Sequence, residues 1–261
     1  MRPQLFIRVA LVILSAFAVP SGGAMAQAQA ATTASPLPPD VELDSLLSAR
    51  NWSQLGSVLL RPYPATEFAR KLSWLKTRTD NGGGFFLPLL YARDLWIVGD
   101  SAKIADLAKD PRVTAGLMSL YAFELIIIDG AKCEDRTAPD NRVSQLLTQR
   151  AAALNFLKQQ PADLKAKIID IAIALERKTA PLRKDDDLVC RNGLAEMKAG
   201  LERGTQQEVP NTGGYVGKRI AVTPPPDWSP NFVSPDVYSP MQDKARANMR
   251  SNLLKLVERP S

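Results

Sequence analysis

The longest apolar segment beyond the N-terminal region spans residues 111–130 and predicts a central buried helix. Its apolar residues recur three, four and seven positions apart and so share one face, which an adjoining apolar stripe widens; they include Leu117, Leu120, Tyr121, Ile127 and Ile128. Asp110 can cap this helix, and Pro111 fits its first position, where a missing N–H costs nothing. Gly130 is predicted to end it in the left-handed conformation.

Two charged residues interrupt apolar helix faces. Glu124 lies on the apolar face of the central helix, and Arg93 lies on that of the helix predicted over residues 85–99. A buried carboxylate must find a partner or take up a proton. We therefore predict a structural ion pair between Arg93 and Glu124, with Asp94 or Asp129 as further partners, that fixes the register of the two helices.

The same periodicity predicts further helices before and after this pair. They begin at capping or proline residues and end at glycine, proline or polar loops, and their ranges are 41–50, 52–60, 66–79, 101–109, 141–159, 163–178 and 189–201. No repeat with the signature residues of a known repeat class is present. The fold class expected is all-α, as an irregular helical bundle or a short α-solenoid around the central helix, with residues 40–204 forming the helical domain.

Beyond residue 204 the composition changes. Residues 205–239 are rich in proline and glycine, and their aromatic residues, such as Trp228 and Phe232, are widely spaced. We expect an extended arm that touches the body through single aromatics, with plain disorder as the alternative. Residues 240–258 predict a C-terminal helix with a basic surface around an apolar stripe. It is expected to pack on the body, and the alternatives are an anionic membrane surface or a partner.

The N-terminus has the pattern of a secretory signal peptide. Arg2 and Arg8 precede or flank an apolar run, and an Ala-x-Ala pattern follows at residues 24–26. Cleavage after Ala26 would leave a flexible leader over residues 27–39 and a periplasmic or secreted protein. No later segment is expected to span a membrane. Loss of two basic residues and no acid would lower the formal net charge from +6 to +4, too little for a nucleic-acid-binding surface.

The chain has two cysteines, Cys133 and Cys190. In an exported protein an isolated pair is most simply a disulfide. The alternative is a reactive or metal-binding thiol, but the two are far apart in sequence and no other soft ligand accompanies them. We predict a Cys133–Cys190 disulfide.

The absence of histidine excludes several kinds of chemistry. Ser-His-Asp and Cys-His catalysis and the H-E-x-x-H zinc site all need imidazole. The run Asp185 to Asp187 lacks the spacing of a calcium loop, so we interpret it as a solvated linker. The glycines at 82–84 lack the Lys-Ser or Lys-Thr of a phosphate loop. No metal and no cofactor is therefore expected.

Two functions remain. The first is a non-enzymatic exported scaffold or binding module of the cell envelope, whose contact surface involves the arm and whose partner is another envelope protein. The second is a carboxylate-dependent hydrolase or lyase of cell-wall glycan. In it Glu124 would be the general acid, because a carboxyl in an apolar pocket keeps its proton at neutral pH.

Overall fold

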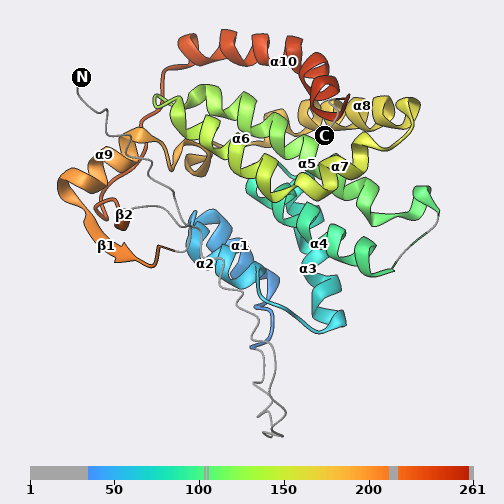
Figure 1. Ribbon diagram of the computed structural model, residues 1–261, viewed down its shortest axis with the longest axis horizontal. Helices are drawn as coiled ribbons and strands as arrows, with labels where there is room; N and C mark the ends of the chain where they lie inside the picture. Colours follow the sequence, from blue (N-terminus) through green and yellow to red (C-terminus); the bar gives the residue numbers. More distant parts are fainter. Residues whose placement is uncertain (1–34, 103, 105, 212–216, 259–261) are drawn as a thin grey trace, which may run out of the picture.

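The computed structural model describes residues 35–102, 104, 106–211 and 217–258. The predicted signal peptide, residues 1–26, and residues 27–34 of the predicted leader lie outside this range. The described chain is mostly helical, with ten α-helices and one two-stranded sheet (Figure 1). The predicted all-α fold class agrees with this content.

The first four helices enclose a hydrophobic cluster of their own. They are α1 (Asp40–Ser48), α2 (Trp52–Leu59), α3 (Ala65–Asp80) and α4 (Phe86–Ala102). The buried residues of this cluster come from all four helices and from Leu37, and they include Leu43, Leu55, Trp74, Leu75, Leu87 and Leu90. Because α4 also packs against α5, it joins this cluster to the larger one.

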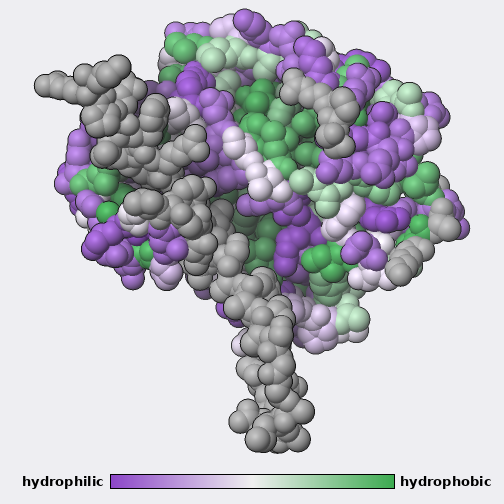
Figure 2. Space-filling view, in the orientation of Figure 1, coloured by the Kyte–Doolittle hydropathy of each residue, from purple (hydrophilic) through white to green (hydrophobic). Residues whose placement is uncertain are grey.

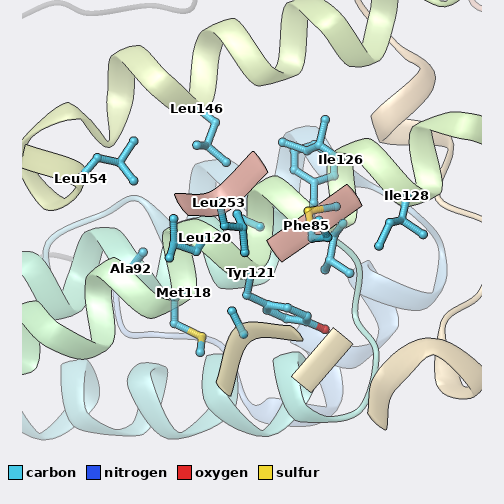
Figure 3. Packing of buried hydrophobic residues seen from close by; sticks show 14 of the residues in the cluster. Phe85, Ala92, Met118, Leu120, Tyr121, Ile126, Ile128, Leu146, Leu154 and Leu253 are labelled. Carbon is cyan, nitrogen blue, oxygen red and sulfur yellow. The ribbon is translucent and has the colours of Figure 1, made fainter. Parts of the chain in front are cut away.

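Helix α5 (Pro111–Asp129) is the central helix of the larger cluster and packs against α4, α6, α7, α8 and α10. Its N-terminus forms as predicted, since Asp110 Oδ1 accepts a 2.8 Å hydrogen bond from the Arg112 amide. Figure 3 shows side chains of α5, among them Leu120, Tyr121 and Ile126, packed with residues from neighbouring helices.

The C-terminus of α5 differs from the prediction. Gly130 has φ −60° and continues into a 3₁₀ turn, Gly130–Lys132, instead of adopting the left-handed conformation. A Cβ at Gly130 would lie 2.6 Å from the Cβ of Pro139. Glycine is therefore required here by close packing, and not by its freedom at positive φ.

Residues 111–132 are long and apolar enough to cross a membrane, the one such segment among the described residues. In the structure, 72 % of the 18-residue window that meets this criterion is buried inside the protein, as is typical of a core helix.

Helices α6 (Thr137–Gln149), α7 (Ala151–Lys158) and α8 (Ala162–Thr179) follow. The predicted single helix over 141–159 is divided at Arg150, whose φ of −107° departs from helical values. The division lets α7 pack on α5, where Gly116 leaves room: a Cβ there would lie 2.5 Å from Leu157 Cγ.

The helix predicted over 189–201 also forms in two pieces. A 3₁₀ turn, Asp187–Cys190, precedes α9 (Leu194–Arg203), and Asn192 between them has a positive φ of 69°. Two other 3₁₀ turns, Leu107–Lys109 and Ala180–Leu182, link longer helices.

The C-terminal segment contains more regular structure than expected. Strands β1 (Thr205–Val209) and β2 (Arg219–Thr223) pair antiparallel and contact α9, at the end of the molecule remote from α8 (Figure 1). Helix α10 (Pro235–Glu258) begins five residues before the predicted residue 240. The prediction of an extended arm up to residue 239 is therefore wrong for residues 235–239, where the Ser234 carbonyl accepts from the amides of Val237 and Tyr238 and so begins the helix.

Helix α10 lies along one edge of the molecule (Figure 1) and contacts α5, α7 and α8. Its buried residues are Met249, Leu253 and Val257. Figure 2 shows this face covered largely by polar residues, with hydrophobic residues visible in the hollow below α10.

Candidate functional site

The two sequence-predicted partners, Glu124 and Arg93, do not pair. Among the described residues neither carboxylate oxygen of Glu124 has a hydrogen-bond partner, and the residue is 0 % exposed. Arg93 is partly exposed at the surface of α4, where its Nη1 lies 3.2 Å from Asp94 Oδ1. The prediction of an Arg93–Glu124 ion pair is therefore wrong. Helical periodicity indicates the face of the helix on which Arg93 lies, but it does not determine the direction in which its long side chain extends.

A buried ion pair does exist, between α3 and α4. Lys71 Nζ lies 2.8 Å from Asp94 Oδ2, and both side chains are 1 % exposed. The ammonium also donates to the Leu59 carbonyl at 3.1 Å and lies 4.7 Å from the ring centroid of Phe68. Phe68, Lys71 and Leu75 share one helix face at spacings of three and four, a signal that could have identified Lys71 from the sequence.

Near Glu124, α5 and α8 enclose a network of buried charges. Arg183, beyond the end of α8, places its Nε 2.9 Å from Asp129 Oδ2 and its Nη2 2.6 Å from Glu176 Oε1. Arg246 of α10 binds the same Glu176 carboxylate at 3.2 Å. Glu176 thus forms ion pairs with two cations, whereas Glu124 forms one with neither of them.

Tyr121 lies between the apolar core and the buried charges: its ring is in the core and its hydroxyl is hydrogen-bonded to α8. Its hydroxyl lies 2.7 Å from Thr179 Oγ1, and Figure 3 shows the ring among the apolar side chains with its oxygen directed away from them. Burial raises the pKa of the Tyr121 phenol to about 12. The hydroxyl therefore stays protonated at neutral pH. Its hydrogen-bond partner is Thr179, at the edge of the charged network.

The carboxyl of Glu124 is neutral at pH 7. Burial, and secondarily the negative charge of Glu176, raises its pKa from 4.5 to about 9, although Arg183 and Arg177 act in the opposite direction. A neutral carboxyl explains how Glu124 can occupy the core without a cation. The raised pKa also means that the free energy of unfolding should fall as the pH rises.

We expect Glu124→Gln to flatten the pH dependence of stability. Between pH 4.5 and about 9 the folded protein keeps the proton that the unfolded chain loses, so the free energy of unfolding falls as pH rises. One such group contributes at most about 1.4 kcal/mol per pH unit. Urea unfolding at several pH values should show the wild type losing more stability than the variant towards pH 9. Parallel pH profiles of the two proteins would contradict this assignment.

The acidic run 185–187 is solvated only in part, because Asp185 is exposed whereas Asp186 is buried and Asp187 is partly buried. Asp185 lies 2.9 Å from Lys132 Nζ, Asp186 accepts from the Leu188 amide, and Asp187 accepts a 3.0 Å bond from the Trp52 indole. Burial, and next the charge of Asp129, raises the pKa of Asp186 to about 7. The run joins α2 to the C-terminal end of α5, which local charge density could not reveal.

The glycine loop packs against this same segment. Gly82 and Gly84 both have φ +80°, and a Cβ at Gly84 would lie 2.5 Å from Asp186 Oδ2. Glycine is required at both positions, because other residues rarely adopt this φ and the space is filled. The loop between α3 and α4 therefore packs closely against residues 182–186.

The two cysteines lie at disulfide geometry, with Cα atoms 5.2 Å apart and both side chains buried. The arrangement fits the predicted Cys133–Cys190 bond and joins the end of α5 to the turn before α9. Cys133 also forms a β-bridge with Phe232, flanked by bonds from the Glu134 amide to the Asn231 carbonyl and from the Val233 amide to the Lys132 carbonyl. The bond therefore adjoins the place where the C-terminal segment pairs with the body.

A surface pocket of about 250 Å³ opens beside the disulfide; we call it the arm pocket. Its walls come from the body and from the C-terminal segment, and its lining residues are Glu134, Asp135, Cys190, Ala195, Trp228, Ser229, Pro230 and Asn231. Of these residues the sequence indicates only Trp228, as a contact residue, and Cys190, as a disulfide partner, since nothing in the local sequence shows that these segments meet.

Asp135, which lines the pocket, is held in place by hydrogen bonds from two helices. Its carboxylate accepts hydrogen bonds from the Thr137 amide at 2.9 Å and from the Ala195 amide at 2.7 Å, so one side chain serves the first turns of both α6 and α9. Burial raises the pKa of Asp135, but the hydrogen bonds from Thr137 and Ala195 outweigh it and the net pKa is lowered. The carboxylate is therefore charged at neutral pH.

The catalytic candidate from the sequence and the arm pocket are separate features of the structure. Glu124 has no exposed surface and does not line the arm pocket. Within the described residues no group of three potential metal ligands is close enough to hold an ion. Neither a protein-family model, nor a curated protein sequence, nor a solved structure matches this chain.

Proposed function

We propose that this protein is an exported, non-enzymatic binding module of the cell envelope, and that its contact surface is the arm, residues 205–239, together with the arm pocket. The observation that carries the proposal is the pocket itself, which combines an aromatic ring, exposed polar groups and two carboxylates between the arm and the body. The buried cysteine pair supports export, because disulfides persist in oxidising compartments.

The alternative, a glycan hydrolase or lyase with Glu124 as general acid, has the raised pKa of Glu124 in its favour. A general acid must lie within hydrogen-bond reach of the atom that it protonates. The full burial of Glu124 opposes this. A turbidity assay on cell walls with wild type and Glu124→Gln decides: clearing by the wild type alone would establish the enzyme.

The binding proposal is tested by retention of a partner on the immobilised protein. Ser229→Arg places a bulky cation at the exposed pocket wall, and Ser144→Arg makes the same change on the exposed face of α6. We expect wild type and Ser144→Arg to retain the same protein from an envelope extract, and Ser229→Arg to lose it. Recovery of nothing by any of the three, together with turnover of a substrate by the pure protein, would overturn the proposal.

A further inference from the structure

We propose that the arm pocket binds the charged end of a lysine or arginine side chain presented by the partner protein. This inference rests on the binding function proposed above and names the chemistry of its contact. It follows from the charge of the lining, from the position of one indole ring and from the size of the cavity.

The charge of the lining favours a cation. Both charged residues that line the pocket, Glu134 and Asp135, are acids. Asp135 is held in place by amides and a hydroxyl, none of which carries a compensating charge. Glu134 is exposed and forms no ion pair with any residue in the described part of the chain. A ligand with a positive charge would therefore meet two carboxylates and no competing cation in the pocket wall.

The indole of Trp228 supplies the second element of a cation site. The Arg191 guanidinium stacks on it at 5.3 Å and donates to its carbonyl, which fixes the position of the ring. Arg191 does not line the pocket, and Asp187 at 3.7 Å and Glu196 at 3.5 Å offset its charge. An ammonium or guanidinium beside an indole gains cation–π attraction in addition to its attraction to carboxylates.

The size of the pocket limits the ligand to one side chain. Its volume of about 250 Å³ lies below the range of about 300–1,000 Å³ that is typical of small-molecule sites. The Ser229 hydroxyl and the Asn231 side-chain amide are available as polar groups on the arm side. Pro230 and Trp228 line the same pocket as Glu134, so the apolar stem of a lysine or arginine would lie against the first two residues and its charged end against the third.

The test uses the full, disulfide-bonded protein and three matched probes. Nα-acetyl-lysine methylamide and Nα-acetyl-arginine methylamide carry the proposed group, and Nα-acetyl-norleucine methylamide keeps the alkyl stem without a charge. NMR or calorimetric titration at low ionic strength, where screening is weak, should show saturable binding of both cations at least about tenfold tighter than the norleucine probe. Equal affinity for all three probes would overturn the proposal.

Substitutions at two pocket positions, with one control elsewhere, locate the binding. Glu134→Gln should weaken the lysine probe about tenfold, whereas Glu42→Gln, the same change at an exposed position on α1, should leave it unchanged. Trp228→Phe should weaken binding less than Trp228→Ala, with circular dichroism as the check on folding. Unchanged affinity in Glu134→Gln would refute the assignment, and because Glu134 is exposed this variant should fold normally.

The outcomes separate this inference from the proposed function. If the probes do not bind but Ser229→Arg still abolishes retention of a protein partner, the binding function stands and the lysine or arginine contact is refuted. If the probes bind but no envelope protein is retained, the pocket is a site for free amines and the contact with a partner protein is refuted. Loss of the retained partner in Glu134→Gln, with retention by Glu42→Gln, supports both.

Discussion

Replacing Arg183 by methionine should lower the free energy of unfolding by about 3–5 kcal/mol. The guanidinium is 3 % exposed and lies between Asp129 and Glu176, at 2.9 and 2.6 Å. Its Nη1 also donates to the Glu176 carbonyl at 3.1 Å, at the end of α8. Methionine fills part of the same volume but leaves two buried carboxylates without their main cation, so the loss exceeds that of one hydrogen bond.

Arg246→Met is the matched control. Arg246 binds the same carboxylate of Glu176 at 3.2 Å, but its side chain is 31 % exposed and Arg183 remains in place. Solvent screening should limit its effect to about 1 kcal/mol or less. Urea unfolding of the three proteins at neutral pH measures both values. Equal losses in the two variants would show that burial does not determine the strength of this network.

The sequence is sufficient to predict the central helix and its first turn. The spacing of apolar residues over 111–129 and the Asp110 cap depend only on local geometry, and the structure has both. The same periodicity shows that Glu124 faces the core. It cannot show that Glu124 stays unpaired, because the cations near it, Arg177 and Arg183, come from a segment about 50 to 60 residues later in the chain.

Segments whose structure depends on tertiary contact were predicted less well. The run Asp185 to Asp187 has the composition of a solvated linker, but Trp52 and Lys132 reach it from distant positions. Helix α10 starts at Pro235, inside the segment whose proline content predicts an extended arm, because proline is favoured at a first helical position. The arm pocket combines residues from 134–135, 190–195 and 228–231, and no short-range pattern brings those ranges together.

Removal of the disulfide is expected to have a comparably large effect. Cys133 and Cys190 are 57 positions apart, and closing a loop of that length lowers the entropy of the unfolded chain by an amount worth about 4 kcal/mol. The double variant Cys133→Ala with Cys190→Ala should therefore unfold at lower urea concentration, by roughly that loss of free energy. Since total stability is usually about 5–15 kcal/mol, the loss is a substantial part of it.

Reductant gives the control for this prediction. It should destabilise the wild type to the level of the double variant and leave the double variant unchanged. Hydrogen exchange of the Glu134 and Val233 amides should accelerate in both cases, because these amides hold residues 231–233 against the body beside Cys133. If reduction lowered global stability without changing exchange at these two amides, the disulfide would stabilise the helical body alone. The attachment of the arm would then depend on the contacts of Trp228 and Phe232 and on the packing of α10.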